Sequence, residues 1–331
     1  LGDVYKRQIL FFVSCKDKKQ YYEESGTVFH TLYTIKYEAP HILTDKIDAE
    51  LQKFNLSLNP FNPNSIIAKV NNNEAVEVDE WFTEVFNKSM EVSRNSDGVF
   101  DITCAPLVNL WGFGFNKKDS VTPAMIDSLK TFVGYRKVHL EGKKVVKDDP
   151  RLLLNCSAIA KGYSCDVIAR LLEKEGVENY MILIGGEVVV KGVNQNGVCW
   201  RTGINLPEDD PDGIKNNYDE IVQLCKKGAI ATSGNYRNFY IKDGKKYAHT
   251  IDPRTGYPAE QSVLSATIVA NDCMTADAYA TAFMAMGLEK ARQMADSLPE
   301  IEYYVIYADE NGKHQIEYSK GMLQYLPKRK Q

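Results

Sequence analysis

The stretch Thr275-Ala-Asp277-Ala-Tyr-Ala-Thr281-Ala-Phe-Met-Ala-Met286 begins the clearest helical segment of the chain, which we predict to extend from 275 to 297. Asp277 and Thr281 are four residues apart, so their side chains share one face of this helix. A carboxylate and a hydroxyl form a small cation site, which Mg²⁺ tolerates because substrate phosphates and waters complete its coordination. The alternative is structural: an acidic residue stabilised by the helix dipole, with a threonine packed beside it.

Three further segments also place small residues beside reactive polar groups. They are Asn155-Cys-Ser-Ala158-Ile-Ala-Lys161-Gly162-Tyr163, Ala231-Thr-Ser233-Gly-Asn-Tyr236 and His249-Thr-Ile251-Asp252-Pro-Arg-Thr-Gly256. Small residues let backbone N–H groups approach an anion, and hard oxygen ligands can hold a cation. The four segments together predict a site for a nucleotide and a metal ion.

Each of these segments has a functional and a simpler interpretation. Lys161 can place an ammonium near a pyrophosphate at a helix start, or be a solvated first-turn lysine, because no GxxxxGK[ST] motif precedes it. The Ala158 carbonyl can face a metal, and the Ser233 hydroxyl suits a phosphate or a ring edge. His249 is either a general base or a structural histidine, and we expect Asp252 to cap a turn.

A segment near residue 100 combines aromatic side chains with an acceptor. Val99, Phe100 and Asp101 offer a ring for stacking and a carboxylate for a hydrogen bond. The following aromatics, Trp111 and Phe113, fit core packing better than Phe100 does.

Composition excludes several classes of function. The 331 residues carry a net charge of −4, which argues against a nucleic-acid partner, because binding a phosphate backbone needs clustered Lys and Arg. No apolar run is long enough to span a bilayer as a helix. The length and the ordinary apolar fraction predict a soluble globular chain with a substantial core.

The N-terminal residues resemble the end of a bacterial lipoprotein signal. A short apolar run, 9–13, is preceded by Lys6 and Arg7 and followed by Ser14 and Cys15. We expect Cys15 to be lipidated and residues 1–24 to form a truncated signal and a tether to the membrane. The other interpretation is a frayed apolar tail.

The remaining cysteines show neither CxxC spacing nor a histidine at zinc-ligand distance. They are Cys104, Cys156, Cys165, Cys199, Cys225 and Cys273. We expect small buried hydrophobes. Disulfides are possible in an oxidising compartment, but the sequence does not pair them.

The order of elements favours an α+β fold with mixed or antiparallel sheets and packing helices. Besides 275–297, we predict helices over 42–55, 80–96 and 162–175. We predict strands over 26–37, 151–154, 180–184, 228–232, 239–241, 247–251, 264–270 and 303–307, and a hairpin of 188–193 with 200–204. No repeat or linker follows residue 25, so one catalytic unit over 25–325 is the simplest organisation.

Taken in this order, the four segments resemble the ApbE family, the FAD:protein FMN transferases. The most specific matches are Ala158-Ile-Ala-Lys161-Gly162-Tyr163 with Asp166, Ala231-Thr-Ser-Gly-Asn-Tyr236, His249-x-x-Asp252-Pro-x-Thr-Gly256, and Ala276-Asp277-Ala-x-Ala-Thr281. The resemblance runs from about residue 26 to about residue 307. It implies a T-fold-like unit that cleaves the FAD pyrophosphate with Mg²⁺, attaches FMN through a phosphoester to a Thr or Ser hydroxyl, and releases AMP.

The resemblance also implies roles for individual residues. Ala158 (through its carbonyl), Asp277 and Thr281 would hold Mg²⁺, with Asp277 and His249 as the catalytic residues and His249 as the base for the acceptor hydroxyl. The FAD site would include Ser25, Phe61, Val99, Phe100, Asp101, Asn155, Lys161, Ser233 and Ile251. The acceptor would be a flavoprotein subunit of a membrane redox complex, and Cys15 would anchor the enzyme on the periplasmic face of the inner membrane.

The chain departs from the family pattern at three places. The family usually has Met at the position of Ser25, often Asp at that of Asn155, and a Ser-x-Tyr motif near Phe61. The first and third departures affect expected flavin contacts, and the second lowers the negative charge near the cation. The Asp277 and Thr281 pair is intact.

Two alternative functions stay open from the sequence. In one, the chain hydrolyses FAD to FMN and AMP, with water replacing the acceptor hydroxyl. In the other, it is a flavin-binding lipoprotein without chemistry. A storage site has no need of the Asp277 and Thr281 pair, which favours catalysis.

Overall fold

An antiparallel sheet of eight strands forms the centre of the computed structural model, which describes residues 19–114, 121–208, 217–236, 239–242, 245–259 and 262–327. The strand order is β1-β2-β5-β6-β9-β14-β15-β16. These strands are β1 (Gln20–Val28), β2 (Thr31–Ala39), β5 (Tyr180–Ile184), β6 (Glu187–Lys191), β9 (Gly228–Gly234), β14 (Val263–Ala270), β15 (Ile301–Ala308) and β16 (His314–Tyr318). The α+β class predicted from the sequence is confirmed.

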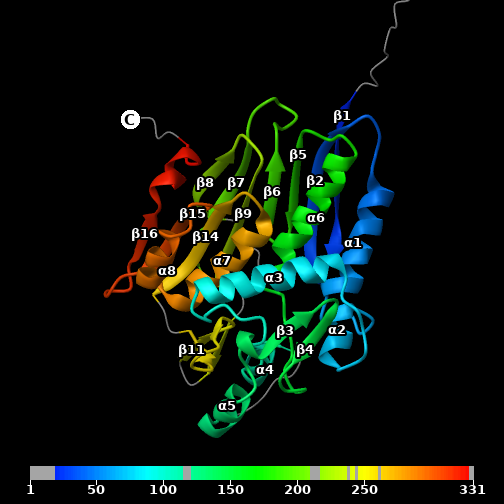
Figure 1. Ribbon diagram of the computed structural model, residues 1–331. Helices are drawn as coiled ribbons and strands as arrows, with labels where there is room; N and C mark the ends of the chain where they lie inside the picture. The colour runs from blue at the N-terminus through cyan, green and yellow to red at the C-terminus, as the bar shows by residue number, and fades with distance from the viewer. Residues whose placement is uncertain are drawn as a thin grey trace, which may run out of the picture.

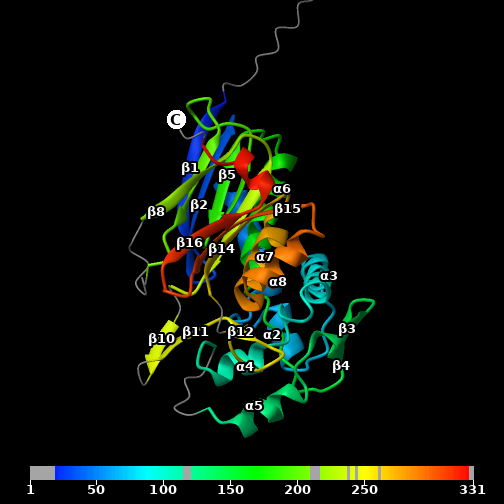
Figure 2. The same ribbon diagram turned by 90° about the vertical axis from the view of Figure 1, so that its left-hand side faces the viewer.

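Helices cover one face of this sheet and a hairpin covers the other (Figures 1 and 2). The helices are α1 (Thr44–Leu58), α3 (Glu80–Asn95), α6 (Ala160–Lys174), α7 (Cys273–Met286) and α8 (Leu288–Ala295), and the hairpin is β7 (Trp200–Asn205) with β8 (Tyr218–Leu224). Strand β6 shows why both faces of the sheet are buried. Val189 packs in the cluster under the helices, whereas Val188 and Val190 pack with Trp200 of the hairpin, because successive side chains of a strand point to opposite faces.

A second group of short elements lies at one end of the sheet, below it in Figure 1. It contains α2 (Ile66–Asn71), α4 (Ala105–Leu110), α5 (Pro123–Lys130), and the pairs β3 (Val138–Glu141) with β4 (Lys144–Lys147), β10 (Phe239–Lys242) with β11 (Lys245–Ala248), and β12 (Ile251–Asp252) with β13 (Tyr257–Pro258). Trp111 ties two of these parts together: its indole Nε1 donates to the Gly256 carbonyl at 2.8 Å. Core packing, predicted for Trp111, is confirmed.

Helix α7 is the most buried element of the fold. Every residue of it except Thr281 is buried, as expected for a helix that is apolar on all sides. It packs on β9 and β14 and against α6 and α3. Thr281 is therefore the most accessible residue of this central helix.

Four predicted elements differ from the structure, one of them the strand predicted over 247–251, which is interrupted between β11 and β12. The strand predicted over 26–37 is two strands, β1 and β2, because Phe29 and His30 adopt positive φ values of 51° and 60° and form a tight turn. The helix predicted over 275–297 is two helices, since Gly287 has a φ of 80° and ends α7. The strand predicted over 151–154 is reduced to an isolated bridge at Leu153.

The hairpin predicted from 188–193 with 200–204 is wrong in its pairing. Both segments are strands, but β6 pairs with β5 and β9, and β7 pairs with β8. A single bridge between Val193 and Cys199 connects them. Alternation along a strand shows that it has two faces, but does not identify its neighbour.

The predicted tether ends earlier than expected. Strand β1 begins at Gln20 and pairs with β2 over its whole length, so residues 20–24 belong to the folded unit. The expected lipidation site, Cys15, lies outside the described residues. Within the part of the chain that the structure describes, no helix combines the length and the apolarity that crossing a bilayer would require.

One disulfide closes the hairpin that covers the back of the sheet. Cys199 precedes β7 and Cys225 follows β8, and their sulfur atoms are bonded. The sequence left a disulfide possible without identifying a pair, and strand pairing brings these two cysteines opposite each other. The expectation of small buried hydrophobes is wrong for them. It holds for Cys156, Cys165 and Cys273, which are free and buried, while free Cys104 is half-buried.

Replacing both Cys199 and Cys225 by Ser should lower the free energy of unfolding by about 2–4 kcal/mol, because the unfolded chain loses a loop closure. Urea unfolding of the variant and of the wild type, with and without reducing agent, measures this. The reduced wild type should match the variant. A variant as stable as the oxidised wild type would contradict the prediction.

Candidate functional site

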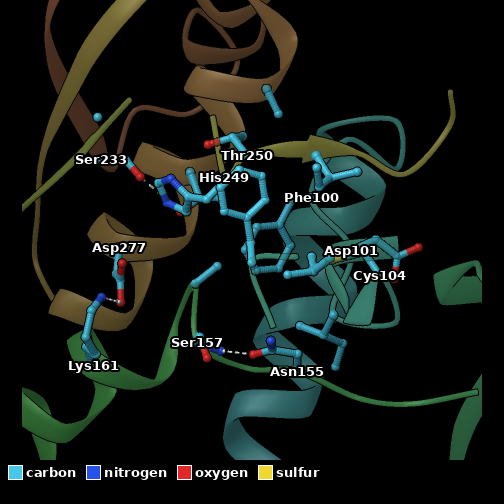
Figure 3. A pocket seen from close by; sticks show the side chains of 18 of the residues that line it. Phe100, Asp101, Cys104, Asn155, Ser157, Lys161, Ser233, His249, Thr250 and Asp277 are labelled. Atoms are coloured by element: carbon cyan, nitrogen blue, oxygen red, sulfur yellow. Dashed lines mark hydrogen bonds and ion pairs between the residues drawn. The ribbon is translucent and has the colours of Figure 1, made fainter. Parts of the chain in front are cut away.

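A pocket of about 550 Å³ opens between the end of the sheet and the second group of short elements (Figure 3). Its volume is within the range of small-molecule sites. Strands β6 and β9, helix α7, the loop before α6 and the loop after α3 all contribute to its walls. The four segments singled out in the sequence therefore converge on one cavity.

The polar end of the pocket depends on a close approach of α6 to α7. A Cβ built on Gly162 would lie 2.2 Å from the Cys273 carbonyl oxygen and 2.7 Å from the Asp277 Cβ. Without a side chain, the Gly162 N–H donates to Asp277 Oδ2 at 2.9 Å. The glycine thus lets backbone and carboxylate meet, and this bond orients the Asp277 side chain.

The start of α7 is held by a second buried carboxylate from α6. Asp166 accepts hydrogen bonds from the backbone N–H groups of Cys273 and Met274, at 2.9 and 2.8 Å. Burial raises the pKa of the Asp166 carboxyl to about 7, although both backbone donors oppose this shift. Free N–H groups at a helix start need such an acceptor, so Asp166 positions α7 against α6.

Asp277 and Thr281 both contribute side-chain oxygen atoms to the pocket wall. Both line the pocket, as does Ala158, and Ser233 Oγ lies 3.4 Å from Thr281 Oγ1. Asp277 is 6% exposed, so its carboxylate is held in a poorly solvated wall. Carbonyl, hydroxyl and carboxylate oxygens are ligands that a hard cation prefers, so these residues fit Mg²⁺.

The candidate site contains few charged ligands of its own. Among the described residues, no group of three or more His, Cys, Asp or Glu side chains could hold a metal ion. A cation bound near Asp277 would therefore need oxygens from a ligand to complete its coordination. A diphosphate supplies such oxygens.

Lys161 lies between two buried carboxylates. Its Nζ is 2.8 Å from Glu187 Oε1 and 3.7 Å from Asp277 Oδ2, and Figure 3 shows Lys161 and Asp277 pointing toward each other. Burial acts to lower the pKa of Lys161, but Asp277 and Glu187 outweigh it and leave that pKa above its ordinary value. Lys161 is thus a fixed positive charge in the pocket wall.

The opposite wall is largely apolar, with one structured loop. Val99 and Phe100 are buried and line the pocket, as predicted. Asp101 also lines it, but Oδ1 accepts from the N–H and hydroxyl of Thr103 and Oδ2 accepts from the N–H of Tyr135, all at 2.7 Å. Its carboxylate therefore shapes the loop, and burial raises its pKa.

The histidine segment forms the third side of the pocket. His249 lies on the side of Ser233, and its ring packs edge-on against Phe113 with centroids 6.4 Å apart (Figure 3). Ile251 is buried in β12 and faces the same cavity. Asp252 accepts from the backbone N–H of Arg254 at 3.0 Å, so its predicted role as a turn cap is confirmed.

The structure brings together nearly all of the predicted site residues. Those lining the pocket are Phe61, Val99, Phe100, Asp101, Asn155, Ala158, Lys161, Ser233, His249, Ile251, Asp277 and Thr281. Ser25 is the exception: it is an exposed residue of β1, and its hydroxyl lies 3.2 Å from that of Thr34. The prediction for Ser25 is wrong because the turn at Phe29 and His30, and not the Gly26 position, approaches the pocket, where the His30 ring contacts Phe61.

Sequence reasoning missed several lining residues. Phe113 packs against a core cluster, as predicted, but also lines the pocket. Tyr236 and Ser157 line it as well. The most important omission is Glu187, a buried carboxylate beside Lys161. Its signal was the pair Gly185-Gly186 after a buried strand, a turn that directs the next side chain into the site.

Comparisons with known proteins identify relatives of this chain. The model of the ApbE family matches residues 29–305. The FAD:protein FMN transferase of Vibrio cholerae is 35% identical over 87% of this chain and 88% of its own, and that of Escherichia coli K12 is 32% identical over 86% of each. The structure of the flavin transferase ApbE from Vibrio cholerae has a TM-score of 0.83 and 33% identity over 93% of this chain and 100% of its own.

Replacing Gly162 by Ala should destabilise the fold by about 1–3 kcal/mol, because the methyl group would overlap the Cys273 carbonyl and force α6 away from α7. Urea unfolding measures the change. Gly228→Ala is the matched control, since a Cβ there meets its nearest atom at an ordinary 3.7 Å. Equal stability of the two variants would show that the helices are not in the contact described.

Proposed function

This chain belongs to the ApbE family, and we propose that it is an FAD:protein FMN transferase that moves FMN from FAD to a Thr or Ser hydroxyl of a target flavoprotein, with Mg²⁺ and release of AMP. The observation that carries this proposal is the convergence of Asp277, Thr281, Lys161 and His249 on one pocket. Cation ligands, an ammonium and a base are the groups that phosphoryl transfer to a hydroxyl requires.

The reaction exchanges the phosphoanhydride bond of FAD for a phosphoester bond to the acceptor hydroxyl. The acceptor hydroxyl oxygen attacks the phosphorus that carries riboflavin, and the bond from this phosphorus to the bridging oxygen breaks. AMP leaves with the bridging oxygen, and the hydroxyl proton passes to the imidazole of His249. Catalysis of such a transfer consists mainly of positioning and charge stabilisation.

The residues of this chain divide these tasks. Lys161 supplies a fixed positive charge for the diphosphate, and the apolar wall of Val99 and Phe100 suits the flavin ring. Ala158, Asp277 and Thr281 would hold Mg²⁺, which when bound supplies charge neutralisation at the diphosphate. His249, whose ring packs against Phe113 in the pocket wall, would receive the proton of the acceptor hydroxyl.

We further propose that the protein acts on the periplasmic face of the inner membrane, anchored through Cys15, on a flavin-carrying subunit of a membrane redox complex. The lipoprotein-like sequence before Cys15 supports this location. The disulfide between Cys199 and Cys225 supports it independently, because such bonds persist in oxidising compartments.

The transfer is tested by incubating the protein with FAD, Mg²⁺ and a candidate acceptor, followed by intact mass measurement of the acceptor. We expect a mass gain of one FMN moiety and an equal amount of AMP. AMP release without labelling of any acceptor would instead identify an FAD pyrophosphatase. FAD binding without turnover would identify a flavin-binding protein.

His249→Ala should leave FAD binding intact and slow transfer by about 10²- to 10⁴-fold, the usual effect of losing a general base. Fluorescence titration with FAD and single-turnover labelling of the acceptor separate binding from chemistry. His139→Ala is a control, because this histidine is an exposed residue of β3 outside the pocket. Unchanged transfer would remove His249 from the mechanism.

Asp277→Asn should reduce cation-dependent AMP release on the order of 10²-fold or more, because metal stabilisation of the transition state is worth several kcal/mol. AMP release is measured at increasing Mg²⁺ concentration. Asp127→Asn on the exposed side of α5 controls for loss of one negative charge. Full activity of Asp277→Asn would exclude this carboxylate as a cation ligand.

A further inference from the structure

Glu187 is a buried carboxylate that the mechanism above does not use. It is the first residue of β6, directly after the turn at Gly185 and Gly186, and its side chain is 5% exposed. Because it faces the helix side of the sheet, it lines the pocket beside Lys161. Burial raises the pKa of its carboxyl to about 7, with Asp277 adding to the shift and Lys161 opposing it. Burying a carboxylate costs free energy, so we expect Glu187 to have a function.

The two carboxylate oxygens of Glu187 differ in their hydrogen bonds. Oε1 accepts from Lys161 Nζ at 2.8 Å, while Oε2 has no hydrogen-bond partner among the described residues. Gly185 leaves room for the pair: a Cβ there would lie 3.0 Å from Lys161 Cδ and 3.2 Å from Glu187 Oε2. The backbone turn thus seats the lysine and the glutamate together against the sheet.

Lys161 is shared unequally between two carboxylates. Its ammonium lies 2.8 Å from Glu187 and 3.7 Å from Asp277, so the closer pair takes the larger part of the attraction. If the charge of Glu187 were removed, Asp277 would be the only anionic partner in this cluster. The ammonium would then move toward Asp277 and form a close ion pair with the carboxylate that a divalent cation needs.

We propose that Glu187 is a positioning residue that holds the Lys161 ammonium away from Asp277 and so keeps the Asp277 carboxylate open to a divalent cation. This inference rests on the proposed cation site and names the group that regulates access to it. The Gly162 N–H and Lys161 both approach Asp277 through Oδ2. By pairing with Lys161, Glu187 limits how strongly the ammonium competes with a divalent cation for the Asp277 carboxylate.

The test measures Mn²⁺ binding to the full chain without FAD, from the loss of the free-ion signal in electron paramagnetic resonance. Glu187→Gln should raise the Mn²⁺ dissociation constant about tenfold, a typical coupling between groups in contact. Glu173→Gln is the matched control. It removes a carboxylate of α6 that pairs with Lys227 and does not line the pocket, so it should change the constant by about twofold or less.

A double-mutant cycle tests whether Glu187 affects Mn²⁺ binding through Lys161. Lys161→Met should bind Mn²⁺ at least as tightly as the wild type, because no ammonium competes for Asp277. Adding Glu187→Gln to Lys161→Met should then change the constant by about twofold or less. Mn²⁺ binding by Lys161→Met also tests the proposal if Glu187→Gln alone folds poorly.

Two outcomes would overturn the proposal. A tenfold loss that persists in the Lys161→Met background would make Glu187 a direct cation ligand, and unchanged binding in Glu187→Gln would give it no part in the site. Failure of the proposed function is a separate result. It would be seen as absence of FMN transfer by the wild type, whatever the Mn²⁺ constants are.

Discussion

The contact between α6 and α7 at Gly162 is the constraint on which the site depends. A backbone without a side chain lets the two helices approach until the Gly162 N–H reaches the Asp277 carboxylate at 2.9 Å. Asp166 holds the same interface one turn further along α6, through two bonds to the start of α7. One helix therefore supplies both the donors that orient Asp277 and the acceptor that fixes its helix.

The contact between α6 and α7 fixes the position of Asp277 because α7 is buried on all sides. The sheet lies on one side of it and α3 and α6 on others, so the helix has no freedom to turn. Thr281, its only residue that is not buried, faces the pocket one turn after Asp277. A central helix fixed by packing thus presents a carboxylate and a hydroxyl to the pocket.

Charge balance is the second theme of the pocket. Asp277 and Glu187 are both buried, and Lys161 is the cation between them. Two carboxylates sharing one ammonium leave a net negative charge, which favours a divalent cation. A diphosphate could then bind against that cation and Lys161. Cation and nucleotide would support each other, which agrees with the small number of protein ligands.

Much of the site followed from local pattern. Helical spacing placed Asp277 and Thr281 on one face, and segments rich in small residues marked the strand ends and helix starts that line the pocket. Resemblance then brought Phe61, Asn155 and His249 into one site, and all three lie there. Ser25 failed because a sequence match gives no turn geometry: positive φ values at Phe29 and His30 place that turn, and not Ser25, beside the pocket.

By itself, the sequence determined the α+β class, the approximate positions of the long helices and the shared helix face of Asp277 and Thr281, because these depend on spacing along one segment. Only the tertiary structure decided which strands pair, that Cys199 meets Cys225, and that Glu187 shares Lys161 with Asp277. Those results depend on distances between segments far apart in the chain. Packing of the sheet and helices sets such distances, and no local periodicity records them.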